Sequence, residues 1–219
     1  FNVTVSGATA GVVVSQPTLV VTINDDDTVS LSAASLSIAE AAGPAVVDVS
    51  MTGSAAHAVS VDYAIVDDTA IAGTDYGPVV ASGTLTWPAL DTATQSVSIP
   101  IIDDAVYELT KAFRVVLSGA TNGATISQAV GDVTIVNDDF VSVTAVSGFF
   151  NESLGSVAAI NVTLSGTSEE AIVVTYVTSD GSAVQPDDYN FVSGTLRWDP
   201  FESGSKTANV VLVDDSIDE

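Results

Sequence analysis

Runs of aspartate stand at the ends of several strand-like segments of this chain. Asp25, Asp26 and Asp27 follow "VVTIN", and Asp138 and Asp139 follow "VTIVN". Two neighbouring carboxylates about 4 Å apart repel by roughly 4 kcal/mol at an effective dielectric near 20. A hard cation removes that repulsion. Ca²⁺ takes about 6–8 oxygen ligands, whereas Mg²⁺ prefers few carboxylates and several waters. The clusters therefore point to calcium.

The acidic clusters recur because the sequence repeats. Residues 1–27 align without a gap on residues 113–139, an offset of 112. "GTDY" matches a later "PDDY", and "IIDDAVYE" at 101–108 matches "LVDDSIDE" at 212–219. Aspartate also favours turns, and a glycosidase would use one special carboxylate pair. Acids at matching places in every repeat favour a metal site instead.

The repeat divides the chain into three parts. We expect residues 1–27 to be the last two strands of one repeat, residues 28–139 to be a complete repeat, and residues 140–219 to be a repeat that lacks its last two strands. Apolar and polar residues alternate at 45–53 and 59–66, as in half-buried strands. About seven short strands in about 110 residues predict an immunoglobulin-like β-sandwich, so the expected fold class is all-β.

The composition excludes several classes of function. A net charge of −24, with 28 acidic residues against four basic ones, argues against nucleic acid and against an anionic membrane surface. No apolar run approaches 18 residues, so we expect no membrane insertion. The absence of cysteine excludes disulfides and thiolate chemistry. His57 is the single histidine, so a zinc site or a Ser-His-Asp triad has no support, and we expect no enzyme. The first residues show no signal-peptide pattern and no initiating Met, and we expect a segment of a longer protein.

The order of the motifs resembles that of one known family. "GTDY", "SGTLTW", "IIDDAVYE", "FRVVLSGATNGATI" and "VTIVNDD" follow one another in the complete repeat. This order is similar to that of the Calx-beta domain, the calcium-binding sandwich of sodium/calcium exchangers, of one integrin subunit and of large bacterial surface proteins. The resemblance covers nearly the whole chain and implies that calcium lies at one pole of each sandwich.

Carried over residue by residue, the resemblance implies three sets of Ca²⁺ ligands. In the complete repeat they are Glu40, Asp75, Asp103, Asp104, Glu108, Asn137, Asp138 and Asp139. The partial repeats contribute Asp25, Asp26 and Asp27 at the start of the chain, and Glu152, Asp188, Asp214, Asp215 and Glu219 at its end. Asn137 departs from the family, which often has aspartate there, and it offers a neutral amide oxygen.

Tandem sandwiches braced by calcium suit a structural role. We expect a non-enzymatic repeat of a large extracellular adhesin, surface-layer or fibre protein on a bacterial cell surface, with an adhesion ligand that the sequence does not identify. The alternatives are a calcium-sensing regulatory module, as in the exchangers, and a module that binds glycans or a host protein. Submicromolar calcium affinity would favour the sensor.

The first 27 residues correspond to the two strands that the last repeat lacks. Either the chain is a window from a continuous tandem array, or these strands of one copy complete the last repeat of the next copy by strand complementation. The expected partners are accordingly adjacent repeats of the same chain or neighbouring copies, which would join head to tail into a filament.

Overall fold

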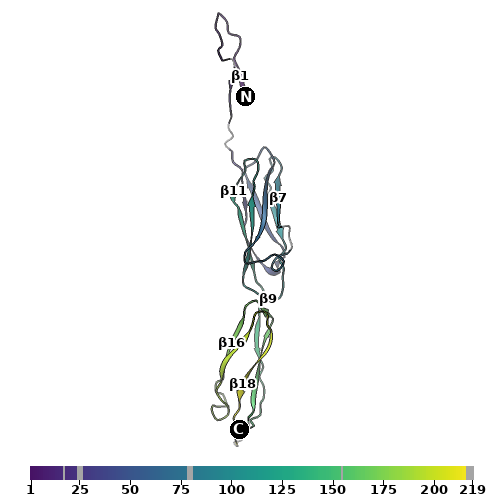
Figure 1. Cartoon of the computed structure of the whole chain (residues 1–219), viewed down its shortest axis with the longest axis vertical. Coiled ribbons are helices and arrows are strands. Elements are labelled where there is room, and N and C mark those ends of the chain that lie inside the picture. Colours follow the sequence, from purple (N-terminus) through teal and green to yellow (C-terminus); the bar gives the residue numbers. More distant parts are fainter. Residues whose placement is uncertain (17, 24–26, 78–80, 154, 216–219) are drawn as a thin grey trace.

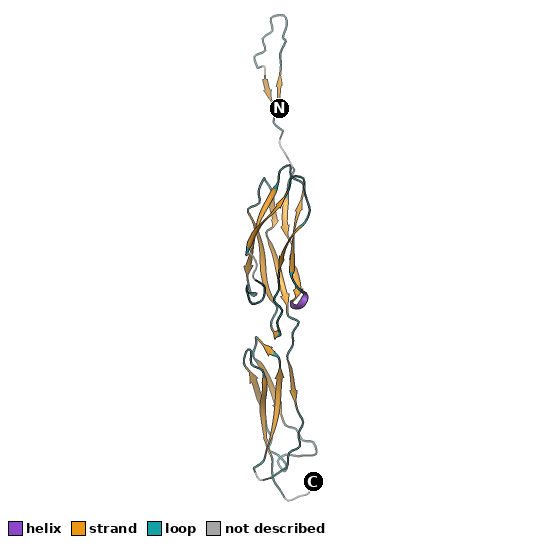
Figure 2. Ribbon diagram, turned by 90° about the vertical axis from the view of Figure 1, so that its right-hand side faces the viewer, coloured by secondary structure: helices purple, strands orange, loops and turns teal. Residues whose placement is uncertain are grey.

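The computed structural model describes residues 1–16, 18–23, 27–77, 81–153 and 155–215. Its strands form three parts that follow one another along one long axis (Figure 1). We call them the N-terminal hairpin (residues 1–23), the middle sandwich (residues 27–139) and the C-terminal unit (residues 140–215). The N-terminal hairpin and the C-terminal unit lie at opposite ends of the molecule in both views (Figures 1 and 2).

The middle sandwich consists of two sheets. Its strands are β3 (Ser30–Ala33), β4 (Leu36–Ala39), β5 (Ala45–Thr52), β6 (Val59–Asp67), β7 (Ser82–Trp87), β8 (Gln95–Ile99), β10 (Lys111–Ser118), β11 (Thr125–Gln128) and β12 (Val130–Val136). One sheet has the order β11-β3-β5-β8 and the other has the order β4-β12-β10-β6-β7. β11 with β3 and β12 with β4 pair in parallel, and the other neighbours are antiparallel.

Alternation along the strands creates the core between the sheets. In β5, Val47 is fully buried whereas Val46 beside it is 48% exposed, as the pleat of a strand requires. One cluster of buried residues surrounds Tyr76 and Phe113, whose rings stack with centroids 4.3 Å apart. A second cluster surrounds Trp87. The predicted all-β sandwich is confirmed.

The sequence does not predict two of the elements. β11 reads TISQ, and only one of its four residues is even partly buried, so it lacks the alternation of a half-buried strand. A 3₁₀ turn, η1 (Glu40–Ala42), follows β4 and is too short to show a helical period. Within the described ranges, no helix is long and apolar enough to cross a membrane.

The C-terminal unit is a smaller and more open structure. β13 (Ser142–Ala145), β14 (Val157–Ser165) and β18 (Gly204–Val211) form one sheet, and β16 (Ile172–Val177) pairs with β17 (Ser193–Trp198). Its buried cluster holds Val162, Leu164, Leu196 and Trp198. Among the described residues, β16 has one strand neighbour, whereas its counterpart β6 lies between two strands.

The middle sandwich and the C-terminal unit touch through a short pair of strands. β9 (Val106–Tyr107) pairs in parallel with β15 (Thr167–Ser168), at the place where the two parts meet (Figure 1). The backbone N–H of Glu169 extends this contact by donating to the carbonyl of Tyr107 at 2.9 Å. Backbone pairing and a short covalent connection therefore both join the two parts.

The N-terminal hairpin stands apart from the middle sandwich (Figure 2). β1 (Asn2–Thr4) pairs with β2 (Thr18–Val20) in an antiparallel register. All six residues of these two strands are exposed.

Candidate metal centre

Three carboxylates meet at the end of the middle sandwich that faces the C-terminal unit. Glu40 lies on η1 directly after β4, and Asp138 and Asp139 come shortly after β12. The two strands are parallel neighbours with Ala39 opposite Val136, so their C-terminal ends lie at the same edge of the sheet. One carboxylate oxygen of each acid lies within 4.8 Å of the others. We call this end the acidic pole.

Crowding at the acidic pole perturbs the titration of its members. Burial first, and then the charges of Glu108, Asp104, Asp139 and Asp103, raise the pKa of Glu40 to about 7. Burial, followed by the charges of Asp138, Asp103 and Asp104, also raises the pKa of Asp139. Asp103 and Asp104 therefore lie close enough to act on Glu40 and Asp139, although their own side chains are exposed.

One atom of the cluster lacks the partner that burial demands. The Oδ2 of Asp139 is buried, and no hydrogen bond from the described residues reaches it. An unpaired buried carboxylate oxygen is costly, and a cation beside Glu40 and Asp138 would satisfy it. All donors at this position are hard oxygens, as Ca²⁺ prefers. The residues present therefore fit a calcium ion.

The other half of the acidic pole contains an internal cation. The Nζ of Lys111, the first residue of β10, lies 2.8 Å from Asp75 and 2.9 Å from Glu108. It also lies 3.4 Å from Glu169, which the C-terminal unit contributes. Burial opposes the charge of Lys111, but its hydrogen bonds to Asp75 and Glu108 outweigh burial and raise its pKa. Lys111 thus gives Asp75 and Glu108 a shared counter-charge, although burial outweighs it at Glu108 and raises the pKa of that carboxyl.

Local hydrogen bonds hold the acidic pole in shape. Asp138 accepts from the backbone N–H of Ala41 at 3.3 Å, and Asp104 accepts from that of Val106 at 2.7 Å. The amide of Asn137 accepts from the N–H of Glu108 at 3.1 Å through Oδ1 and donates to the carbonyl of Asp139 at 2.8 Å through Nδ2. An ionised aspartate has no N–H for the second bond, which gives a structural reason for asparagine at this position.

The sequence matches one family of domains twice. The Calx-beta domain matches residues 22–139 and again residues 138–219. The chain belongs to the Calx-beta family. Sodium/calcium exchanger Calx of Drosophila melanogaster is 29% identical over 161 residues, which is 72% of this chain and 16% of that protein. The chain thus spans a small part of this relative.

Solved Calx structures are also similar to this chain. The apo-form Calx CBD1 domain is 28% identical, with a TM-score of 0.46, over 52% of this chain and 100% of that domain. CBD12 from CALX1.2 is 25% identical, with a TM-score of 0.46, over 85% of this chain and 75% of that structure. Calx-beta domains are regulatory or structural modules rather than enzymes.

The second Calx-beta match places its predicted ligands at the far end of the C-terminal unit. Asp188 and Asp215 line one hollow there, and Asp188 accepts from the N–H of Val184 at 2.6 Å. Asp214 and Glu152 are exposed, and Glu219 lies outside the described residues. In the described part of the chain, only the acidic pole of the middle sandwich gathers three carboxylates closely.

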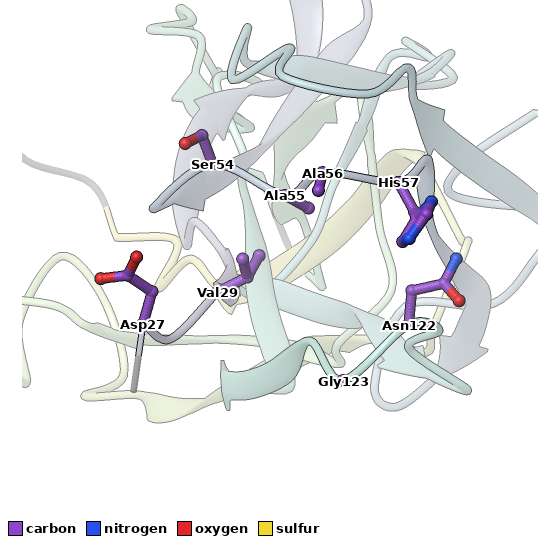
Figure 3. A pocket seen from close by; sticks show the side chains of 8 residues that line it. All are labelled: Asp27, Val29, Ser54, Ala55, Ala56, His57, Asn122 and Gly123. Atoms are coloured by element: carbon purple, nitrogen blue, oxygen red, sulfur yellow. The ribbon is translucent and has the colours of Figure 1, made fainter. Parts of the chain in front are cut away.

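The acids of the N-terminal segment are only partly described. Asp25 and Asp26 lie outside the described residues. Asp27 lies at the opposite end of the middle sandwich from the acidic pole, beside a hollow that Ser54, Ala55 and His57 also line (Figure 3).

Sequence reasoning misses two residues of the acidic pole. Lys111 stands three residues after Glu108, a spacing that suggests an ion pair, but sequence spacing does not reveal that Asp75 joins it. Glu169 belongs to the following Calx-beta repeat, in "SEE", where the complete repeat has "AAH". That difference between the repeats is the only sequence signal for its role.

Proposed function

We propose that the chain is a calcium-stiffened structural module in which Glu40, Asp138 and Asp139 hold a Ca²⁺ ion at the joint between two sandwiches. The buried, partnerless Oδ2 of Asp139 is the observation that carries this proposal. Membership of the Calx-beta family supports the choice of metal. The ion supplies the positive charge that these carboxylates lack.

The position of the site links it to stiffness. Asp139 is the last residue before the C-terminal unit, and the β9–β15 pair and the contact between Glu169 and Lys111 lie at the same joint. Carboxylates whose repulsion is neutralised can hold the ends of β4 and β12 together, so the chain leaves the sandwich in one direction. Glu40, Asp138 and Asp139 would then set the angle between consecutive repeats.

We further propose that the parent protein is a large extracellular adhesin, surface-layer or fibre protein. Extracellular calcium is millimolar, so sites with dissociation constants of about 10⁻⁴–10⁻³ M would be filled. Cysteine-free sandwiches in tandem then gain stability from the ion, because it binds the folded state alone.

Thermal unfolding with and without calcium tests this function. A calcium titration should raise the melting temperature. It should also narrow the distribution of distances that fluorescence energy transfer measures between a dye on the middle sandwich and a dye on the C-terminal unit. Glu40→Gln should weaken both effects, and Glu170→Gln, which changes an exposed acid of the C-terminal unit, should weaken neither. Equal melting in excess calcium and in excess chelator would refute the proposal.

A calcium-sensing regulatory module is the second candidate. Two observations favour it: the relative is a sodium/calcium exchanger, and the acidic pole receives Glu169 from the next repeat, so ion binding can change domain orientation. Calcium affinity separates the two functions. A dissociation constant of about 10⁻⁶ M or below supports a sensor, and one of about 10⁻⁴ M or above supports the structural module.

A further inference from the structure

One of the four basic side chains of this chain is buried at the acidic pole. The side chain of Lys111 is 11% exposed, whereas those of Arg114, Arg197 and Lys206 are 47%, 58% and 31% exposed and form ion pairs at the surface. A buried ammonium is costly unless carboxylates surround it. Its position among the Ca²⁺ ligands that the family resemblance implies therefore points to a specific role.

The ammonium of Lys111 has the surroundings of a bound cation. Its Nζ lies 2.8 Å from Oδ1 of Asp75, 2.9 Å from Oε1 of Glu108 and 3.4 Å from Oε2 of Glu169. The side chains of Asp75 and Glu108 are 5% and 11% exposed, and that of Glu169 is 38% exposed. Three carboxylates from two consecutive repeats thus surround one positive charge. We call Lys111 and these three carboxylates the lysine half of the acidic pole.

The carboxylates of the lysine half already have partners. Oδ2 of Asp75 accepts from the backbone N–H of Ile71 at 2.6 Å, and its Oδ1 accepts from Lys111. Ligands lie about 2.3–2.6 Å from a calcium ion, so an ion that used Asp75 and Glu108 would have to displace the ammonium or lie directly beside it. Two adjacent cations repel strongly in a partly buried site. Asp75 and Glu108 therefore do not fit calcium while Lys111 is present, although the resemblance implies them as ligands.

The rest of the acidic pole has no internal cation. Glu40, Asp138 and Asp139 are the three carboxylates whose oxygens lie within 4.8 Å of one another. Within the described part of the chain, no basic side chain forms an ion pair with them. We call these three residues the metal half. The protein provides a positive charge for one half of the pole and leaves the other half to a metal.

We propose that Lys111 occupies the place of a second Ca²⁺ ion, so that the acidic pole takes calcium only at its metal half. This inference rests on the function proposed above. An ammonium that is covalently attached to β10 cannot dissociate, so the lysine half stays filled at every calcium concentration while the metal half fills and empties. Lys111 thereby sets the number of ions that the pole binds.

The same arrangement has a consequence for the joint. Glu169 belongs to the C-terminal unit and Lys111 belongs to the middle sandwich. Because the lysine half needs no metal, this contact ties two consecutive repeats with and without calcium. The metal half then adds a second, calcium-dependent constraint at the same joint.

Equilibrium dialysis of the full chain against Ca²⁺ tests the proposal by counting ions. Lys111→Ala removes the ammonium and leaves room between three carboxylates, so this variant should bind one more ion per chain than the wild type. Arg114→Ala removes the same charge from the same strand, where the ion pairs are exposed, and should bind the wild-type number. An equal number of ions in the wild type and in Lys111→Ala would overturn the proposal.

The dialysis also separates the proposal from the function on which it rests. A wild type that binds no calcium, together with a Lys111→Ala variant that binds one ion, would refute the calcium-stiffened module and support the role of Lys111. If neither protein binds calcium, both the function and the role of Lys111 are refuted.

Calcium titration of Asp75→Asn tests the same point with the ammonium in place. The asparagine oxygen can still accept from the N–H of Ile71 and from Lys111, so the local fold is kept. The dissociation constant should stay within about threefold of the wild-type value, because the lost charge does not touch the ion. Glu40→Gln should bind at least about tenfold more weakly. Equal weakening in the two variants would make Asp75 a ligand and exclude the proposal.

Discussion

At the scale of single residues, the acidic pole answers the crowding of negative charge in two ways. Asp75 and Glu108 share the ammonium of Lys111, which stays charged because their hydrogen bonds outweigh its burial. Glu40 and Asp139 have no such partner, and their pKa values are raised. Lys111 thus stabilises the first pair in the absence of a metal, although burial still raises the pKa of Glu108, and a cation would stabilise the second pair.

Glu40→Gln should therefore have opposite effects with and without calcium. The substitution removes a buried, repelled carboxylate, so the chelated protein should gain about 1 to 3 kcal/mol of unfolding free energy at pH 8. It also removes a ligand, so calcium should bind at least about tenfold more weakly. Denaturant unfolding and calorimetric titration measure the two effects. A variant that is less stable in chelator would contradict the account of Glu40.

The raised pKa of Glu40 sets a pH dependence. In the folded state it is about 7, against an ordinary value of 4.5. Between these values the folded state holds the proton more tightly than the unfolded state does. In chelator, this group therefore destabilises the fold as pH rises from about 4.5 to about 7. Calcium competes with the same proton, so its affinity should fall by up to about tenfold per unit below pH 7. Titrations at pH 6 and pH 8 would measure this, and equal affinities would contradict it.

Removal of the internal cation should destabilise the sandwich in the absence of calcium. Lys111→Met leaves Asp75 and Glu108 buried without a counter-ion, at a cost of about 3 kcal/mol. Arg114→Met is the matched control on the same strand: its ion pairs with Asp68 and Asp132 are exposed and should contribute less than about 1 kcal/mol. Urea unfolding in chelator compares the variants. Similar losses would show that Lys111 is not the counter-ion that the geometry indicates.

The sequence predicts the type of ligand at the acidic pole better than it predicts which acids pair with Lys111 and which remain for a cation. Repeated acids at strand ends indicate oxygen ligands for a hard cation. Glu40 lies near Asp138 and Asp139 because β4 pairs in parallel with β12. Sequence spacing does not reveal which strands become neighbours. The roles of Lys111 and Glu169 depend on contacts across 36 and 58 residues along the chain, so they appear only in three dimensions.

At the scale of the elements, the two repeats share a contact that fixes β6 against β7 and β16 against β17. A Cβ built on Gly83 would lie 2.7 Å from the hydroxyl of Tyr63, and a Cβ on Gly194 would lie 2.7 Å from that of Tyr176. Tyr63 packs against both core clusters, so its ring cannot move freely. The glycine of the repeated "SGTL" is therefore required for the packing of β7 against β6 and of β17 against β16.

Gly83→Ala should destabilise the middle sandwich by about 1 to 3 kcal/mol through overpacking. Tyr63→Leu removes the atoms that the new methyl group would meet. In the Tyr63→Leu background, Gly83→Ala should therefore lower the free energy of unfolding much less than it does in the wild type. Chemical unfolding of the four proteins completes the cycle. Additive losses would assign the effect of the alanine to the backbone alone.

Sequence patterns predict strands well when one face is buried. The segments at 45–53 and 59–66 alternate because β5 and β6 each place one face in the core, and the structure places both strands there. β9 and β15 have two residues each, too few for any period. They are defined by their pairing across the joint, which depends on how one repeat sits on the next.

At the scale of the whole molecule, the parts differ in the amount of core that they bury. Among the residues that the structure describes, the middle sandwich has clusters of ten and eight buried residues, and the C-terminal unit has one cluster of four. The chain should therefore unfold in two steps, with the C-terminal unit first.

The two tryptophans allow these steps to be followed separately. Trp87 is fully buried in the middle sandwich and Trp198 is fully buried in the C-terminal unit. Trp198→Phe leaves a reporter in the middle sandwich, and Trp87→Phe leaves one in the C-terminal unit. In urea, Trp198 should become exposed at a lower midpoint than Trp87. The free energies of unfolding should differ by at least about 2 kcal/mol, because burial of apolar side chains dominates stability.

Calcium should act on these two signals unequally. Its proposed ligands belong to the middle sandwich, so calcium at 100 times its dissociation constant should raise the Trp87 transition by about 2.7 kcal/mol. Trp198 lies beyond the joint. Calcium should shift the unfolding transition that Trp198 reports only to the extent that the β9–β15 pair and the contact between Glu169 and Lys111 couple the two parts. Glu169→Ala should reduce the calcium-dependent shift of the Trp198 transition and leave that of the Trp87 transition unchanged, whereas Glu170→Ala should alter neither shift. A single shared transition in chelator would instead mean that the joint couples the two parts fully without the ion.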